Sequence, residues 1–484
     1  MRTLLQTSSE IAIKYLEEIG NRKVAPSGEA IDGIERFREQ LPESPADPEQ
    51  VIRMLDEIGS PASVAMAGPR FFGFVIGGSL PAALAANWLA AAWDQNSALY
   101  EVTPATAVIE EVALEWLVDL FGLPNDSGGA FVTGATVANF TALAAARHEV
   151  LKKADWNVEA NGLFGAPPIT VIVSEEAHPT LFKSLGMLGL GRNRVIRVPV
   201  DSQGRMQAEA IPTITGPTIV CAQAGNVNTG AFDPIGEICD AVRSAGAWVH
   251  VDGAFGLWAA ATQKYSCLTE GITKADSWAT DGHKWLNVPY DSGITLVRHP
   301  HALQAAMAIT AEYLPTESTY RNPSDFTPEL SRRARGIEVW AALRQLGRRG
   351  VSDMIDRCCR HARRFAGELA NAGYEILNDV VLNQVLVSFG DADTTRKIIA
   401  DIQADGVCWC GGTVWQGHTA MRISISSWAT TDEDVEMSLK SILKVAGKYA
   451  SSGLLLYTGD LEELFRYEVS KVSLVGPSYV FEFY

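Results

Sequence analysis

Short apolar runs alternate with helical stretches through the central part of the chain, from about residue 104 to residue 310. Brief apolar strands separated by helices are typical of strands buried on both faces, as in a doubly wound, mostly parallel sheet. The predicted strands are 130–132, 170–173, 194–198, 218–221, 248–251, 275–280 and 294–297. We therefore expect a large α/β domain at the centre of the chain.

The pattern changes after Pro323, where longer helical periodicity is followed by strands with alternating polarity. This change predicts a smaller α+β domain at the C-terminal end. Its predicted elements are helices at about 331–346 and 354–372, strands at 385–389 and 421–425, and a helix from Asp432. The apolar, aromatic tail at 469–484 reads equally well as a final strand or as a docking arm.

The N-terminal part reads as helices broken by proline-rich loops, a segment too small to bury a core alone. We expect it to pack on a partner subunit, and we expect the alanine-rich helix at 82–93 to be buried at a subunit contact. The predicted division is residues 1–75 as an N-terminal helical segment, 76–322 as the large α/β domain and 323–484 as the small α+β domain.

Composition narrows the class of protein. The 484 residues carry a formal net charge of −17 and no block rich in lysine or arginine, which argues against nucleic acid and anionic membranes as partners. The seven cysteines are scattered without a C-x-x-C pair, so we expect reduced thiols, no metal site and a cytoplasmic protein. Cys408 and Cys410 are interpreted as core residues rather than zinc ligands.

The chemistry is concentrated after two of the predicted strands. Asp252 follows the run 248–251, and Lys284 follows the strand at 275–280 with His283 directly before it. Carboxyl ends of parallel strands meet at one edge of a sheet, where ligands bind. A lysine that can hold an aldehyde and a carboxylate that can keep a pyridine nitrogen protonated are the groups that pyridoxal phosphate requires. Either residue alone would more often be structural.

Two further segments fit the same hypothesis. Thr133-Gly134-Ala135-Thr136 forms a tight turn before a helical run at 137–153, and backbone N–H groups at a helix start bind phosphate. An ordinary N-cap by Thr136 would leave the same trace. His178 follows the strand at 170–173, where its ring could stack on the cofactor or cap the next helix.

These ordered motifs resemble the group II pyridoxal-dependent decarboxylases, the family of aromatic-amino-acid, glutamate, histidine and tyrosine decarboxylases. The resemblance runs from about residue 69 to about residue 434. The matching pieces are Gly68–Gly73, Gly134–Asn139, Glu176–His178, Gly230–Asp233, His250–Ala254 and His283–Trp285. It implies the fold type I architecture, pyridoxal 5'-phosphate as cofactor and a homodimer.

The resemblance also implies roles for individual residues. Lys284 looks like the Schiff-base lysine and Asp252 like the partner of the pyridinium nitrogen. His178 looks like the stacking histidine and Ala254 like the small residue under the ring. The remaining implied residues are Ala135, Thr136 and His283 as phosphate ligands, Tyr313 as the tyrosine that protonates the carbanionic carbon, and Arg422 as a ligand of the substrate carboxylate.

The sequence departs from the family pattern at three places. Val137 replaces the common glutamate of the phosphate turn. Asn226 and Val227 stand where many relatives have two threonines, so the usual hydroxyl contact to the cofactor would have to come from Asn226. Asp281 stands where the aromatic branch has asparagine near the phosphate, and a second anion there is unfavourable unless it turns away.

The implied reaction is decarboxylation of an L-amino acid to an amine and CO2, with Tyr313 or a relay through His178 returning a proton to Cα. Phe74 lies in the segment 71–78, which matches the stretch that lines the substrate pocket of aromatic decarboxylases, so an aromatic substrate is favoured. The alternative is a pyridoxal phosphate-dependent carbon–carbon lyase or aldolase of the sphingosine phosphate lyase type. Tyr313 favours decarboxylation.

Overall fold

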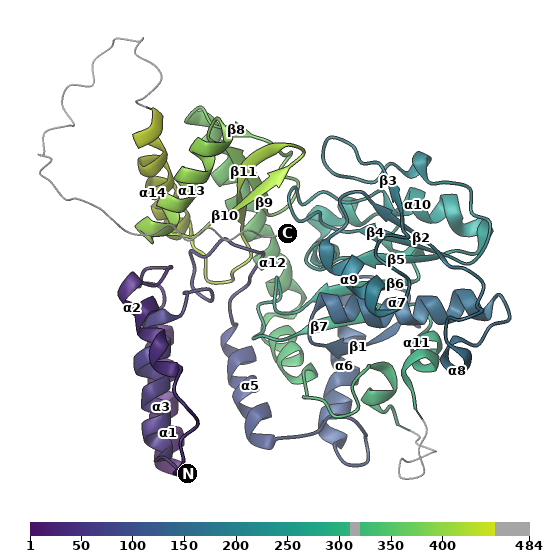
Figure 1. The fold of residues 1–484 in the computed structure, drawn as a ribbon, viewed down its shortest axis with the longest axis horizontal. Coiled ribbons are helices and arrows are strands. Elements are labelled where there is room, and N and C mark those ends of the chain that lie inside the picture. Colours follow the sequence, from purple (N-terminus) through teal and green to yellow (C-terminus); the bar gives the residue numbers. More distant parts are fainter. Residues whose placement is uncertain (310–319, 451–484) are drawn as a thin grey trace, which may run out of the picture.

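A computed structural model of the chain describes residues 1–309 and 320–450 (Figure 1). Its centre is a seven-stranded sheet in the order β1-β7-β6-β5-β4-β2-β3, in which only β7 runs antiparallel to its neighbours. The strands are β1 (Gly128–Val132), β2 (Thr170–Ser174), β3 (Ile196–Val198), β4 (Thr218–Gln223), β5 (Trp248–Asp252), β6 (Ser277–Asp281) and β7 (Gly293–Val297). The predicted doubly wound, mostly parallel sheet is confirmed.

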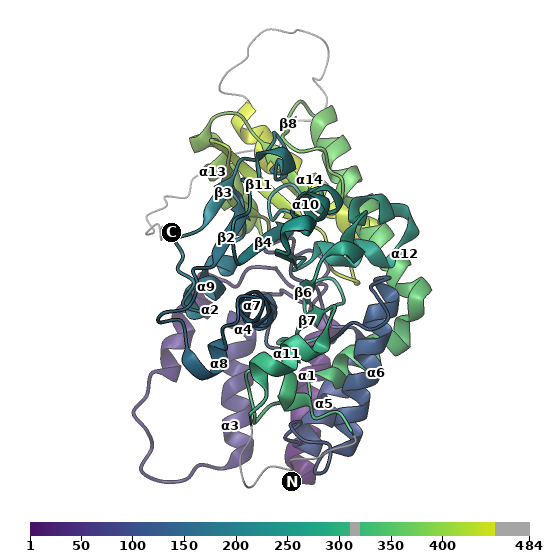
Figure 2. The same ribbon diagram turned by 90° about the vertical axis from the view of Figure 1, so that its right-hand side faces the viewer.

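Helices cover both faces of this sheet because its inner strands are buried on both sides. Helix α7 (Ala135–Lys152) packs across β4 to β7, with α9 (Pro179–Met187) and α11 (Pro300–Met307) beside it. Helix α6 (Pro104–Leu120) packs on β1, and α10 (Ile235–Val242) packs on β4. The short α8 spans Val158–Asn161. The views in Figures 1 and 2 show these helices around the sheet.

A second, antiparallel sheet follows in the order β10-β11-β9-β8. Its strands are β8 (Glu375–Ile376), β9 (Gln384–Ser388), β10 (Gly411–Trp415) and β11 (His418–Ser424), and its helices are α13 (Ala392–Asp405) and α14 (Asp432–Ala450). The sequence pattern missed β8, which has two residues, and β10, whose two glycines and half-exposed residues give no apolar run. Cys408 and Cys410 are buried as expected, outside any strand.

Helix α12 (Gly336–Asn371) links the two sheets, and it consists of two helices that meet at a kink, as the sequence predicted. The kink lies at Gly347, whose φ of 58° is a conformation that glycine adopts without a Cβ clash. The helix packs on α5, α6, β9 and α14. Figure 1 shows it passing between the large and the small sheet.

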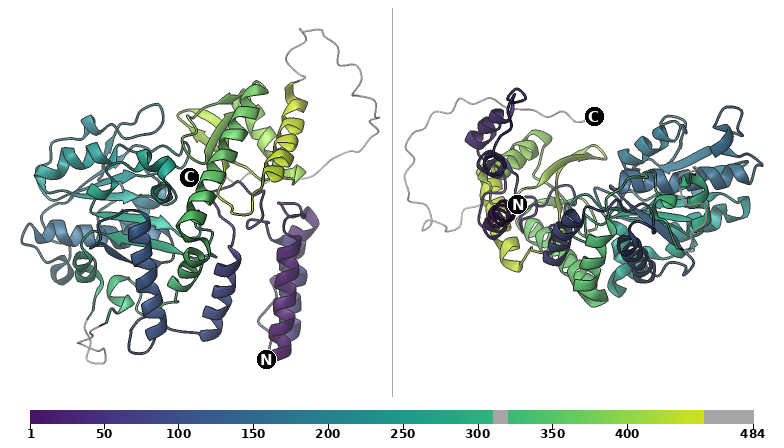
Figure 3. Two further views of the ribbon diagram at one scale, coloured as in Figure 1. Left: turned by 180° about the vertical axis from the view of Figure 1, so that it is seen from behind. Right: turned by 90° about the horizontal axis from the view of Figure 1, so that it is seen from below.

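The N-terminal helices lie at the edge of the molecule beside α5 (Pro81–Trp93) (Figure 3). They are α1 (Arg2–Glu18), α2 (Gly28–Gly33), α3 (Pro48–Met54) and α4 (Ser60–Ala62). In the single chain only Ala83 and Ala90 of α5 are buried, while Trp88 is 42% exposed, and burial of α5 at a subunit contact stays a prediction. Among the described helices, none has an apolar stretch long enough to cross a membrane.

Candidate active site

One cavity of about 280 Å³ opens at the carboxyl edge of the large sheet. The strands β5 and β6 end there at Asp252 and Asp281, and β2 leads into the loop that carries His178. The second sheet contributes Arg422 from β11. Lining residues are Phe74, Val75, Gly134, Ala135, Thr136, His178, Thr180, Gln223, Gly225, Val227, Asp252, Ala254, Phe255, Asp281, His283, Lys284 and Arg422. Ligands bind at this edge in open α/β sheets.

Lys284 lies three residues beyond the end of β6. Its Nζ is 3.1 Å from Asp281 Oδ2, and its side chain is largely buried. The loop that carries Phe74 approaches the lysine backbone so closely that a Cβ at Gly77 would overlap the Lys284 carbonyl oxygen. Glycine at position 77 therefore allows this loop to lie against the lysine.

Asp252 is buried at the end of β5. Its Oδ1 accepts the Ala254 N–H at 3.2 Å, and its Oδ2 accepts a hydrogen bond from Asn139 Nδ2 at 3.1 Å. Burial raises the pKa of Asp252 above its usual value, while His178 and Lys284 favour the ionised form. A hydrogen-bonded, buried carboxylate of this kind can pair with a cationic group in the cavity.

His178 both lines the cavity and caps a helix, so the two alternatives left open by the sequence coexist. Its Nδ1 accepts the Thr180 N–H at 3.3 Å at the start of α9 and lies 2.7 Å from Thr180 Oγ1. Because Nδ1 accepts a backbone proton, the neutral ring carries its proton on Nε2. Burial lowers the pKa of His178, and Asp252 acts in the opposite direction.

The start of α7 faces the cavity, and the alternative of an ordinary N-cap by Thr136 is wrong. Gly134, not Thr136, is the N-cap residue, and the helix begins at Ala135. A Cβ at position 134 would lie 3.3 Å from His283 Cε1, so glycine lets the histidine ring approach the turn. His283 Nδ1 accepts the Ser292 N–H at 3.0 Å, and its ring stacks on Tyr290 with centroids 4.2 Å apart.

Asp281 does not turn away from this turn. Its Oδ1 accepts the Ala135 N–H at 2.6 Å and lies 3.6 Å from His283 Nε2. The carboxylate thus touches the first N–H group of α7 and Lys284 at the same time. The Asp281 side chain therefore links Lys284 to the start of α7, whereas the sequence suggested only an unfavourable second anion near the phosphate.

Arg422 reaches the cavity from the second sheet. Its Nη1 donates to the Val227 carbonyl at 3.1 Å, and burial lowers the pKa of its guanidinium to about 10. Among the described lining residues, it and Lys284 are the arginine and the lysine of the cavity. A buried guanidinium with free donors can bind a carboxylate in a bidentate manner.

Three comparisons place this geometry among known proteins. The sequence model of the pyridoxal-dependent decarboxylase conserved domain matches residues 32–390. The chain belongs to the pyridoxal-dependent decarboxylase family.

Curated relatives of this decarboxylase differ in the substrate class that their names give. It is 26% identical over 466 residues to an aromatic-L-amino-acid decarboxylase of Bacillus atrophaeus, which covers 91% of this chain and 94% of the relative. It is 29% identical over 329 residues to the acidic amino acid decarboxylase GADL1 of Bos taurus, covering 65% of this chain and 62% of that protein. The family is therefore known, whereas the names leave the substrate class open.

Among solved structures, Oryza sativa TDC with PLP and tryptamine superposes with a TM-score of 0.84 at 22% identity, over 93% of this chain and 98% of that one. At this identity the likeness shows the fold. The protein is thus a fold type I, pyridoxal phosphate-dependent carboxy-lyase that acts on an amino acid.

The lining of the decarboxylase cavity fits this cofactor. It offers a lysine amine for the aldehyde, a buried carboxylate for the ring nitrogen and a helix start with backbone N–H groups for the phosphate. The small Ala254 and the ring of His178 also line it. The structure brings together nearly all of the predicted residues, namely Phe74, Ala135, Thr136, His178, Asp252, Ala254, His283, Lys284 and Arg422.

Asn226 is not among the lining residues of the cavity. Its Nδ2 donates to Glu176 Oε2 at 2.9 Å, and its Oδ1 accepts the N–H groups of Asn228 and Thr229. The Asn226 side chain therefore closes its own turn. The neighbouring Val227 lines the cavity instead and brings no hydroxyl group.

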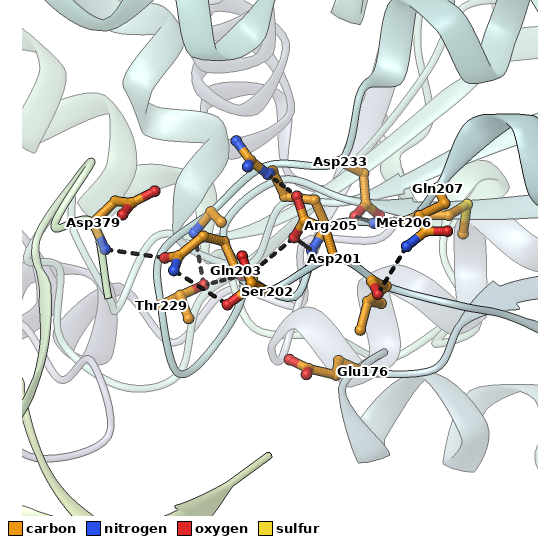
Figure 4. A network of polar contacts seen from close by, with 12 residues as sticks. Glu176, Asp201, Ser202, Gln203, Arg205, Met206, Gln207, Thr229, Asp233 and Asp379 are labelled. Atoms are coloured by element: carbon orange, nitrogen blue, oxygen red, sulfur yellow. Dashed lines mark hydrogen bonds and ion pairs between the residues drawn. The ribbon is translucent and has the colours of Figure 1, made fainter. Parts of the chain in front are cut away.

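A polar network joins Thr229, the last residue of the 226–229 turn, to the segment 201–207 (Figure 4). Thr229 Oγ1 donates to the Gln203 carbonyl at 2.8 Å, and Gln203 Oε1 accepts the Asp379 N–H at 3.0 Å. Asp233 accepts the N–H groups of Met206 and Gln223, and burial raises its pKa to about 7. These contacts fix the end of β4 beside the cavity.

Tyr313 lies outside the described residues. Sequence reasoning missed Gln223 and Thr180, although both stand next to predicted strand or loop positions. It also gave no role to Asn139, which was quoted only as part of a motif. A search for polar residues at the ends of all buried strands would have found Gln223.

Proposed function

We propose that this enzyme decarboxylates an L-amino acid, with an aromatic one favoured, to the amine and CO2 by means of a Schiff base at Lys284. The observation that carries the proposal is the convergence of Lys284, Asp252, His178 and Arg422 on one cavity. Family membership favours loss of the carboxylate over carbon–carbon cleavage.

Each part of the cofactor has a complementary group in the lining. Lys284 would hold the aldehyde carbon and Asp252 the ring nitrogen, while His178 and Ala254 would face the ring. Ala135, Thr136 and His283 would hold the phosphate at the start of α7. When bound, pyridoxal phosphate supplies an electron sink for the pair released at Cα.

The chain itself orients the substrate and moves the protons. Arg422 would bind the substrate carboxylate, and the Asp281 carboxylate, 3.1 Å from Lys284 Nζ, would receive the lysine amine when the substrate displaces it. Tyr313, or His178 through its Nε2–H, would return a proton to Cα. The apolar side chains around the cavity would exclude water from these groups.

The substrate preference rests on the charges and rings of the lining. Arg422 and Lys284 are both assigned to other tasks, which leaves no permanent cation among the described lining residues for an acidic side chain. Phe74 is 60% exposed and stacks on Trp409 with centroids 5.5 Å apart. Its φ of 54° is uncommon outside glycine, so the loop holds this ring in a restrained position at the cavity.

An amino-acid panel tests the proposal directly. Purified enzyme with added pyridoxal phosphate is incubated with single aromatic, acidic, basic and aliphatic L-amino acids, and CO2 and amine are measured, with Lys284→Ala as the blank. Equal amounts of amine and CO2 from an aromatic substrate would support the proposal. Turnover of aspartate or glutamate alone would contradict the aromatic preference, and carbon–carbon cleavage without CO2 would contradict the reaction.

Replacing Arg422 with methionine is expected to raise KM about 10- to 100-fold, because a charge-assisted hydrogen-bonded pair with the substrate carboxylate is lost. Steady-state kinetics on the substrate found in the panel measures this change. Arg422→Lys is the matched variant: it keeps the charge without the bidentate geometry and should lie between the two. An unchanged KM in Arg422→Met would remove the arginine from substrate binding.

Replacing Asp281 with asparagine is expected to tighten pyridoxal phosphate binding about tenfold, because it removes an anion from the proposed phosphate site. Titration of the cofactor-depleted protein with pyridoxal phosphate, followed by fluorescence, gives the Kd. Asp240→Asn, an exposed substitution on α10, is the control. Weaker binding in Asp281→Asn would show that its contacts to Ala135 and Lys284 outweigh the repulsion.

We also propose a homodimer. The N-terminal helices and α5 enclose an open groove of about 440 Å³ that includes Leu16, Leu55 and Trp88, all partly exposed apolar residues. Such surfaces are typical of subunit contacts. Sedimentation velocity should give the mass of two chains.

Seven unpaired cysteines, six of them buried, support a cytoplasmic location.

A further inference from the structure

A continuous row of buried polar side chains leads away from Asp252 into the core. Asn139 on α7 donates from Nδ2 to Asp252 Oδ2 at 3.1 Å. His250 Nε2 lies 2.8 Å from Asn139 Oδ1, and His250 Nδ1 lies 2.9 Å from Ser277 Oγ. Trp248 Nε1 donates to the same Ser277 Oγ at 2.8 Å. All of these side chains are buried.

The chemistry of the members gives this chain a direction. The Asn139 amide nitrogen faces the carboxylate, so its oxygen faces His250 and must accept a hydrogen bond from Nε2–H. A neutral ring protonated on Nε2 leaves Nδ1 as an acceptor, and Nδ1 then accepts a hydrogen bond from the Ser277 hydroxyl group. That hydroxyl oxygen accepts the indole N–H of Trp248. Every donor therefore points toward Asp252.

His250 can stay neutral in this place. Burial lowers the pKa of His250 to about 3, and the side chains that contact its ring nitrogens, Asn139 and Ser277, are both uncharged. The ring thus transmits a hydrogen bond without adding a charge. Chains of aligned hydrogen bonds polarise one another, so the last donor becomes a stronger partner for an anion.

We propose that Asn139 and His250 are positioning residues that hold Asp252 ionised and aimed at the ring nitrogen of the cofactor. This inference rests on the proposed function, which assigns Asp252 to that nitrogen. The Asp252 carboxylate is buried, and an ionised group in that position needs donors other than water. Asn139 and the Ala254 N–H are those donors, one on each oxygen.

The opposite protonation state would reverse the whole row. A protonated Asp252 would donate to the Asn139 oxygen, the amide nitrogen would then donate to His250 Nε2, and the ring would carry its proton on Nδ1. The tautomer of His250 therefore reports on the ionisation of Asp252 through the Asn139 side chain that lies between them. It can be read in the unmodified protein, with no substitution in the core.

The first experiment records long-range ¹H–¹⁵N correlations of the full chain labelled with ¹⁵N-histidine, with and without pyridoxal phosphate, and assigns His250 by its loss in His250→Gln. We expect a neutral ring protonated on Nε2 in the loaded enzyme. A ring protonated on Nδ1, or a charged ring, in the loaded enzyme would overturn the proposal.

The second experiment uses pyridoxal phosphate labelled with ¹⁵N at the ring nitrogen and compares its chemical shift in bound wild-type and variant enzymes. Asn139→Leu and His250→Leu should shift the resonance toward that of an unprotonated pyridine and lower kcat about 10- to 100-fold with little change in KM. His250→Gln keeps a donor for Asn139, so both its ¹⁵N resonance and its kcat should lie close to those of the wild type.

Thr141→Val is the matched control on the same helix. Thr141 is buried and its Oγ1 has no hydrogen-bond partner among residues 1–309 and 320–450, so its replacement disturbs α7 without touching the row. A wild-type resonance in Asn139→Leu, together with a shifted one in Asp252→Asn, would overturn the positioning role of Asn139 and leave the proposed function standing. A wild-type resonance in Asp252→Asn would instead overturn the role of Asp252 in the proposed function.

Discussion

Alanine at position 284 is expected to lower amine formation by at least about 10⁴-fold, because no other described lysine lines the cavity to hold the aldehyde of the cofactor. The visible band of the bound cofactor should be lost, and pyridoxal phosphate should become removable by dialysis. The substitution also leaves Asp281 Oδ2 without its cationic partner. Absorbance spectra after dialysis and product assays on one preparation measure both effects.

Lys274→Ala is the control for this experiment. Lys274 is a half-exposed lysine that pairs with Asp240 and is not among the residues that line the cavity, so its loss should change neither the spectrum nor the rate. A Lys284→Ala enzyme that keeps the band and turns over substrate would refute the assignment of the lysine. Circular dichroism of both variants excludes unfolding as the cause.

Asparagine at position 252 is expected to lower kcat by at least about 10³-fold while leaving the chain folded, because a neutral amide cannot hold the ring nitrogen in its protonated form. The thermal stability of the variant, in contrast, should stay the same or rise. Burial raises the pKa of Asp252, so this carboxyl binds its proton more tightly in the folded than in the unfolded chain.

The sign of this effect can be measured. Stability from a group with a raised pKa is lost as pH rises above its unfolded value, since ionising the buried carboxylate then costs free energy. The cofactor-free Asp252→Asn variant should therefore melt at the same or a higher temperature than wild type, with the difference growing from acidic to neutral pH. Asp391→Ala, at an exposed helix cap, should lose stability instead, because it removes the side-chain oxygen that caps α13. A lower melting temperature for Asp252→Asn at neutral pH would contradict this account.

Much of the large sheet could be predicted because buried strands have a local signature. The apolar runs ending at Val251 and Val173 are set by burial on both faces, which needs no knowledge of the neighbours. The same rule failed for β10, which begins with two glycines and has only one buried residue, Trp415.

The sequence alone determined the family, the cofactor and the presence of Lys284 and Asp252 after adjacent strands, since strand ends and motif order are properties of neighbouring residues. The tertiary structure decided which distant side chains meet. It committed Asn226 to Glu176, turned Asp281 toward the start of α7 and joined Asn139 to His250 across 111 positions. Such pairings depend on strand order and helix placement, because a hydrogen bond acts over about 3 Å and carries no signal along the chain.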